Sequence, residues 1–139
     1  MKRVEDWPER LDEYVESVKD KPFEYTMHDC CAFMAMAVIV ITGVDVMKGL
    51  RTYTDKQSAY RVIKDYAGGG VAEAVEKAMS DHGFQEVPPL MAQRGDVVLF
   101  QTELGDTTGI CVGDRITAPG EKGLLFNPLT DIKRAWRTN

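Results

Sequence analysis

Hydrophobic positions recur at helical spacing through the first half of the chain. The first such segment begins near Asp6, where Glu9 three residues later completes a capping-box pattern, and it ends before Pro22. One face of this segment collects its apolar side chains, namely Trp7, Leu11, Tyr14, Val15 and Val18. The pattern predicts an amphipathic helix, followed by a short connector over residues 23–26.

The second segment, residues 30–41, carries no charge and is apolar on every side. A helix with no polar face is typical of the centre of a core. Residues 38–41 would also suit a strand, but the length of the run and the polar residue before it favour a helix. We therefore expect a central buried helix that ends at Thr42 and Gly43.

Two further helices are predicted before the character of the sequence changes. Thr54 with Gln57 gives another capping-box pattern, and the glycine run at residues 68–70 ends the helix that it opens. A fourth helix then ends near Gly83. Its inward positions are Val71, Val75, Ala78 and Met79.

Short β-branched and aromatic runs separated by glycine and proline fill the second half of the chain. They predict strands at residues 97–100, 108–112, 123–126 and 134–137. Residues 87–95 are expected to form a loop, and Asp96 to fix the turn into the first strand.

The order of these elements predicts the fold class. Helices come first and strands second, without the βαβ alternation that parallel sheets require, which indicates an α+β domain with the buried helix packed on an antiparallel sheet. A chain of 139 residues with 44% hydrophobic content suits one domain over residues 1–139. Its helical part covers about residues 1–83 and its sheet part about residues 94–139.

Charge and composition exclude several classes of partner. The formal net charge of -5 and the absence of a long basic run argue against nucleic acid and anionic membranes. The longest apolar run is too short for membrane insertion, and the charged N-terminus has no signal-peptide core. Three cysteines, two of them adjacent, indicate reduced thiols in a cytoplasm and not a disulfide framework.

Candidate chemistry centres on Asp29 and Cys30, where polar sequence runs directly into the apolar second segment. Asp29 is a preferred N-cap residue for the helix that follows. Cys30 then sits where the positive end of the helix dipole stabilises a thiolate, which makes a cysteine reactive. Nucleophilic catalysis also needs a base within hydrogen-bond reach, and the sequence offers only His28 and His82.

Neither histidine suits the role of that base. His28 lies two positions before Cys30, and the capping geometry tends to point the two side chains apart. We interpret it as a connector residue hydrogen-bonded to nearby backbone, with catalysis as the alternative. His82, beside Gly83 at a helix end, is interpreted as a surface C-terminal cap.

A metal site is a further alternative, with His28, Cys30, Cys31 and Cys111 as ligands. Neighbouring cysteines on a helix diverge by about 100°, and no Cys-x-x-Cys pair is present, so we expect no metal. Cys31 and Cys111 are interpreted as small buried apolar side chains. The glycine run at residues 68–70 lacks the lysine of a phosphate loop, and no cofactor is expected.

Three motifs together resemble the NlpC/P60 superfamily of papain-like cysteine peptidases. Asp29 and Cys30 match its nucleophile motif, and residues 94–100 match the Gly-Asp-apolar motif that begins its sheet. Residues 107–113 match the strand that carries the catalytic histidine, but Thr107 stands where that histidine belongs. The resemblance implies a papain-like fold with Cys30 as nucleophile and a missing base, and the candidate catalytic residues are Cys30, Asp29, His28 and Thr107.

The rest of the pattern is similar to small proteins encoded among phage and prophage tail genes. Residues 43–45, 123–124 and 135–137 carry this similarity. It implies assembly in the host cytoplasm and then a place in the virion tail. The expected function is a catalytically degenerate component that binds other tail proteins or cell-wall peptide. The alternative is an active peptidase or amidase that cleaves peptidoglycan stem peptides through Cys30.

Overall fold

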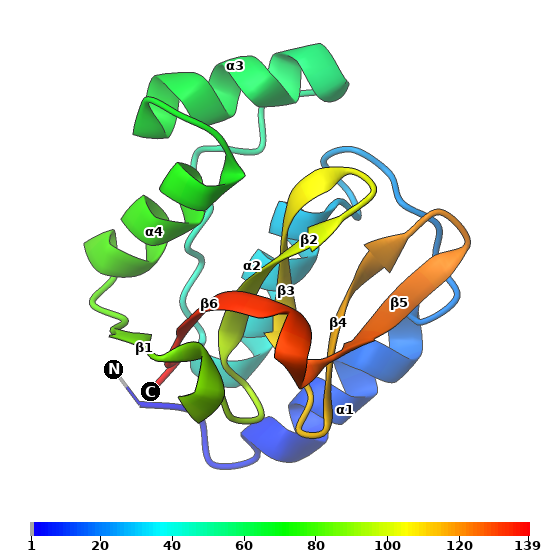
Figure 1. The fold of residues 1–139 in the computed structure, drawn as a ribbon, viewed down its shortest axis with the longest axis vertical. Helices are drawn as coiled ribbons and strands as arrows, with labels where there is room; N and C mark the ends of the chain where they lie inside the picture. Colours follow the sequence, from blue (N-terminus) through cyan, green and yellow to red (C-terminus); the bar gives the residue numbers. More distant parts are fainter. Residues whose placement is uncertain (1) are drawn as a thin grey trace.

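Four helices precede an antiparallel sheet in the computed structural model, which describes residues 2–139 (Figure 1). The helices are α1 (Trp7–Val18), α2 (Cys30–Thr42), α3 (Lys56–Ala67) and α4 (Val71–Asp81). The strands are β1 (Glu86–Val87), β2 (Val97–Thr102), β3 (Gly105–Cys111), β4 (Arg115–Gly120), β5 (Gly123–Pro128) and β6 (Ile132–Trp136), with 3-10 turns η1 (Pro89–Met91) and η2 (Leu129–Asp131). The α+β class is therefore confirmed.

The sheet contains two strands that the sequence pattern does not predict. Its order is β1-β6-β2-β3-β4-β5, and every neighbouring pair is antiparallel. β4 ends in Pro119 and Gly120, a pair typical of turns. β1 has only two residues: Glu86 precedes the loop expected at residues 87–95, and Val87 is the first residue of that loop. Both strands form because a neighbouring strand supplies the pairing, and their own sequences give little signal.

Helix α2 is the buried centre of the molecule, as predicted. Seven of its residues are buried, and Asp29 and Gly43 form its two caps. Gly43 has a φ of 81°, the left-handed conformation that favours glycine at a helix end. Together with α1 and the helix-facing side of β2, β3 and β6, α2 forms the larger of two hydrophobic clusters. The prediction that this helix packs on one face of the sheet is confirmed.

Two predicted capping boxes are wrong. Asp6 precedes α1, but its backbone is not extended and its side chain makes no capping hydrogen bond. Helix α3 is capped one residue later than the pattern indicates, because Asp55 and Ser58 exchange side-chain and backbone hydrogen bonds of 2.8 and 3.0 Å. A capping side chain needs the extended N-cap backbone that Asp55 adopts and Asp6 does not.

None of the helices among residues 2–139 combines the length and the apolar character that a bilayer crossing requires.

Candidate functional site

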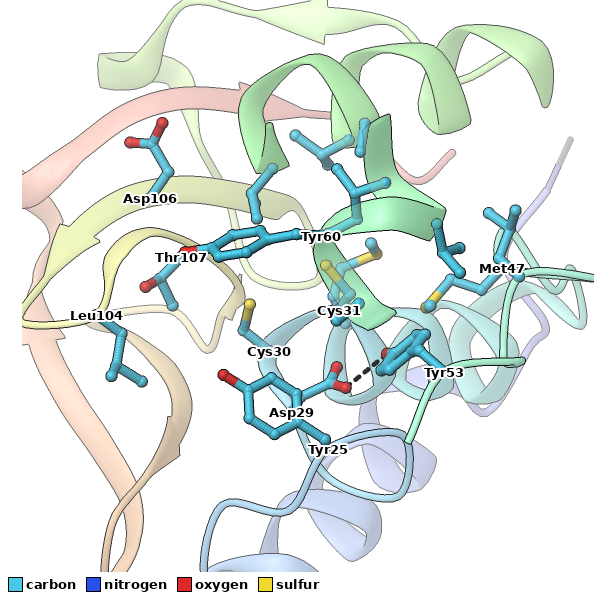
Figure 2. Close-up of a pocket in the computed structure, with 18 of the residues that line it drawn as sticks. Tyr25, Asp29, Cys30, Cys31, Met47, Tyr53, Tyr60, Leu104, Asp106 and Thr107 are labelled. Carbon is cyan, nitrogen blue, oxygen red and sulfur yellow. Dashed lines mark hydrogen bonds between the residues drawn. The ribbon is translucent and has the colours of Figure 1, made fainter. Parts of the chain in front are cut away.

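The N-terminus of α2 is held by Asp29, which is buried. One carboxylate oxygen accepts the backbone N–H of Ala32 at 2.8 Å, the N-cap bond that the sequence predicts. The other oxygen accepts the N–H of Thr26 at 2.8 Å. It also accepts the hydroxyl of Tyr53 at 2.5 Å, the bond drawn in Figure 2. Three donors therefore fix the aspartate, and through it the position of Cys30.

The connector before α2 is bent to make this network. Thr26 has a φ of 76°, a left-handed conformation that is unfavourable for a β-branched residue. Its hydroxyl donates to the Tyr53 carbonyl, and its N–H donates to Asp29. Backbone strain of this kind persists only where the surrounding bonds impose it, and it is concentrated at functional sites. The sequence pattern gives no signal for the roles of Thr26 and Tyr53.

Cys30 and Cys31 are the first two residues of α2 and both are partly exposed. A hydrogen bond from the Cys31 thiol lowers the pKa of Cys30, against burial, and contacts with the backbone and hydroxyl of Thr108 lower it further. The same bond to Cys30, together with burial, raises the pKa of Cys31 well above its usual value. Of the two thiols, Cys30 therefore has the lower pKa, and the Thr108 hydroxyl lies 3.9 Å from the Cys31 sulfur.

Thr107 lies on β3 at the edge of the same cavity and is buried. Its hydroxyl lies 2.9 Å from the hydroxyl of Thr102 and donates to the carbonyl of Gly105 at 3.1 Å. Both partners belong to the β2–β3 hairpin. The structure therefore brings Thr107 and Cys30 to one site, as the resemblance implies, but ties the threonine side chain to its own hairpin.

His28 is turned away from this site. It is 3% exposed, and its ring packs edge-on against Phe33 with centroids 5.9 Å apart. Its backbone bonds with Glu24 in both directions, but its Nε2 is buried without a hydrogen-bond partner, so the expected ring-to-backbone bond is absent at this atom. Burial, followed by the charge of Lys21, lowers the pKa of His28 and favours the neutral ring.

The cavity itself receives no imidazole from residues 2–139, because neither histidine lines it. His82 ends α4, where its Nδ1 lies 2.9 Å from the carbonyl of Ala78. This matches the C-terminal cap predicted for it. Within the same residues no three histidine, cysteine, aspartate or glutamate side chains gather as a metal site, and Cys111 belongs to the second hydrophobic cluster on the other face of the sheet.

The cavity beside Cys30 has a volume of about 220 Å³ (Figure 2), and we divide its lining residues into two groups. We call the first part the rim; it is formed by Tyr25, Tyr60, Glu103, Leu104, Asp106 and Thr107. We call the second part the inner chamber; it lies under α3 and α4 and is formed mainly by Met34, Met47, Leu50, Val62, Ile63 and Val75. Cys30 and Cys31 also line the cavity. The amphipathic pattern of α3 could have indicated an apolar face, but not that this face borders a cavity.

Acidic residues near the sheet have separate structural roles. Asp96 accepts the N–H of Gln93 at 2.9 Å, which confirms its predicted place in the turn before β2. It also forms ion pairs with Arg3 and Arg137, which the sequence does not reveal. Asp106 pairs with Lys133 at 3.1 Å. These carboxylates do not form a paired acid and base.

A family model matches nearly the whole length of the chain. Residues 2–138 match the family model described as Domain of unknown function (DUF6950). No curated protein matches the chain. The matched range contains all residues of the site described above.

Proposed function

This chain belongs to the DUF6950 family, and we propose that it is a papain-like domain of the NlpC/P60 type that binds an extended peptide beside Cys30 without cleaving it. The observation that carries the proposal is which residues line the cavity at Cys30. Cys30 faces a cavity whose opposite side presents Thr107 and no imidazole among the described residues. The nucleophile is present and the proton carrier is missing.

The arrangement of elements supports the papain-like assignment. An Asp-Cys pair opens the buried helix, and the antiparallel sheet follows and packs on it. The hairpin formed by β2 and β3 places Thr107 at the cavity, the position that the superfamily resemblance gives to histidine. Strands β3 and β4 approach each other closely at Gly109, where a Cβ atom would lie 2.3 Å from the carbonyl oxygen of Thr117, so only glycine fits there.

Amide cleavage demands more than a thiolate. The leaving nitrogen must receive a proton, and threonine cannot donate one at neutral pH as an imidazolium does. General acid-base assistance contributes roughly 100- to 10,000-fold to the rate, so its loss leaves hydrolysis too slow to be useful. The bonds of Thr107 to its own hairpin support the same conclusion.

The rim offers a surface for peptide. Tyr60 and Leu104 are 56% and 67% exposed, and Tyr25 lines the same cavity (Figure 2). Exposed aromatic and aliphatic side chains around a concave site are typical of peptide recognition. In our proposal the occupant is a segment of another phage tail protein or a cell-wall peptide, bound after synthesis in the host cytoplasm.

The alternative is an active cysteine hydrolase. The observation that favours it is the lowered pKa of Cys30, caused first by the Cys31 thiol and then by Thr108. A thiolate of this kind is the attacking group of cysteine peptidases. It would need a histidine supplied by another chain.

Digestion of purified muropeptides, read by mass spectrometry, separates the two functions. We expect no released product from the wild type and none from Cys30→Ala. Release by the wild type that the substitution abolishes would establish the hydrolase and overturn our proposal.

Binding is tested with a peptide array that covers muropeptide stems and the proteins encoded by neighbouring genes. Leu104→Asp changes the rim, and we expect it to reduce binding at least about tenfold, because a charge replaces an apolar contact. The matched control is Leu129→Asp, which changes an exposed leucine on η2 away from the cavity. Equal binding by the two variants would contradict the rim as the peptide site.

A further inference from the structure

The inner chamber is better suited to hydrocarbon than to peptide. The six side chains named for it are aliphatic or thioether groups. Two polar side chains that also line the cavity, Asp29 and Tyr53, are hydrogen-bonded to each other at 2.5 Å, and the hydroxyl of Tyr66 is engaged by Asp81 at 3.2 Å. A peptide backbone would carry N–H and C=O groups into this space, and each would need a partner. An alkyl chain makes no such demand.

The size of the cavity sets an upper limit on the length of that chain. An apolar cavity of about 150 Å³ holds benzene, so the whole cavity of about 220 Å³, rim included, accommodates at most roughly nine carbon atoms. A chain of this length is a medium-chain acyl group. It is longer than an acetyl group and shorter than the chains of most membrane lipids.

The reactive thiol lies between the chamber and the rim. Cys30 lines the same cavity, and Figure 2 shows its sulfur between the Thr107 side and the Cys31 side. The neighbouring Cys31 thiol, followed by Thr108, lowers the pKa of Cys30, and the Thr108 hydroxyl lies 3.9 Å from the Cys31 sulfur. The N–H groups of Cys30 and Cys31, at the start of α2, can stabilise an oxyanion on a carbonyl attacked at this place.

We propose that Cys30 is an S-acylation site, which takes a medium-chain acyl group from an acyl thioester and holds the chain in the inner chamber. This inference goes beyond peptide binding, because it assigns a reaction to the thiol. The Cys30 sulfur forms a bond to the acyl carbon, and the carbon–sulfur bond of the donor breaks. The electron pair leaves with the donor thiolate, which then takes a proton from water, and nothing is oxidised or reduced.

The missing imidazole is compatible with this reaction. A thiolate is a good leaving group at neutral pH and needs no acid to leave, whereas an amide nitrogen does. Hydrolysis of the acylated cysteine would need an activated water, and Thr107 does not supply the base. The acyl group therefore stays on Cys30, and the reaction is a modification of the protein, without turnover.

The test uses the full chain and decanoyl N-acetylcysteamine thioester, with intact mass and peptide mapping as readouts. We expect one decanoyl group on Cys30, and no adduct on Cys30→Ala. The rate of acylation should rise about fourfold for each methylene added to the donor, from acetyl to about decanoyl, because each methylene is buried. Donors with longer chains should react more slowly, because the cavity is then full. The corresponding decanoyl amide should give no adduct.

A pair of variants on α4 tests the chamber. Ala74→Phe fills it, and we expect acylation by the decanoyl donor to fall more than tenfold while labelling by iodoacetamide stays unchanged. The matched control, Ser80→Phe, places the same ring on an exposed position of α4 and should leave both rates unchanged.

Three results would overturn the proposal. The first is labelling of Cys30 by iodoacetamide without acylation by any thioester. The second is an equal rate for acetyl and decanoyl donors in the wild type, a comparison that does not depend on the folding of Ala74→Phe. The third is an adduct that persists in Cys30→Ala. None of these results bears on peptide binding at the rim, so failure of the two proposals can be distinguished.

Discussion

At the scale of single residues, Asp29 does more than cap a helix. Its two carboxylate oxygens accept from Ala32, Thr26 and Tyr53, and it is 5% exposed. Burial and the bond to Asp29 raise the pKa of Tyr53, so the tyrosine keeps the proton that it donates. The carboxylate thus joins the connector, the segment before α3 and the reactive end of α2.

Replacing Asp29 by alanine should destabilise the protein by about 3 kcal/mol. Loss of an N-cap costs about 1 kcal/mol, and a hydrogen bond to a charged group contributes about 1.5–3 kcal/mol. Urea unfolding followed by circular dichroism measures the change. The control is Asp55→Ala, an exposed N-cap on α3, for which we expect about 1 kcal/mol. Equal losses for the two variants would show that the buried network adds nothing.

The cysteine pair predicts a pH dependence of labelling. Because the Cys31 thiol lowers the pKa of Cys30, the Cys30 thiolate forms at a lower pH than in a free cysteine, and it is lost as the pH falls through that lowered pKa. Iodoacetamide labelling of Cys30 should therefore have its midpoint below about 8.5, the value of a free thiol. Cys31→Ala should raise this midpoint. A wild-type midpoint at or above that of a free thiol would refute the interpretation.

At the scale of elements, α2 and α3 differ in how they are held. Seven residues of α2 are buried, and Ile41 has no exposed surface, whereas Met36 is 42% exposed. Ile63 and Val62 of α3 are half-buried and border the inner chamber. Figure 1 shows α3 at the margin of the molecule, beyond α4. We infer that α2 carries the stability of the core and that α3 serves mainly as a wall of the cavity.

Truncation of one isoleucine in each helix tests this difference. Ile41→Ala should cost about 3–4 kcal/mol, because it opens a cavity in a packed core. Ile63→Ala should cost about 1 kcal/mol, because its side chain already borders a cavity and buries less surface. Urea denaturation of the two variants measures both values. A loss at Ile63 as large as that at Ile41 would show that α3 belongs to the core.

At the scale of the whole molecule, Asp96 connects the two ends of the chain to the sheet. It is fully buried, and its carboxylate pairs with Arg3 at 3.0 Å and with Arg137 at 3.1 Å. Thr138 lies in the same cluster, where its hydroxyl accepts from Arg3 and donates to the carbonyl of Gly95. The cluster therefore binds the segment before α1 and the segment after β6 to the start of β2.

Loss of this carboxylate should loosen both ends of the chain. Asp96→Ala leaves two partly buried guanidinium groups unpaired, and we expect a loss of about 3 kcal/mol. Asp12→Ala removes the exposed partner of Arg94 and should cost less than about 1 kcal/mol. Urea unfolding gives both values, and hydrogen exchange should show faster exchange near residues 3 and 137 in the first variant. Similar stability of the two variants would argue against a connecting role.

The sequence by itself determined the elements whose signals are local. The unbroken apolar run after Asp29 predicts the buried helix, its N-cap and the placement of Cys30, because periodicity and capping act over a few residues. Gly43 marks the helix end for the same reason. Thr107 and Cys30 line one cavity, to which the β2–β3 hairpin brings the threonine.

Only the tertiary structure decided which residues distant in sequence meet. Tyr53 reaches Asp29 across 24 positions, and Arg3 reaches Asp96 across 93. Strand β4 forms by pairing with its neighbours despite a proline, and the amphipathic face of α3 borders a cavity in place of a packed core. Such features depend on burial and on partners brought together by folding, and no local pattern records them.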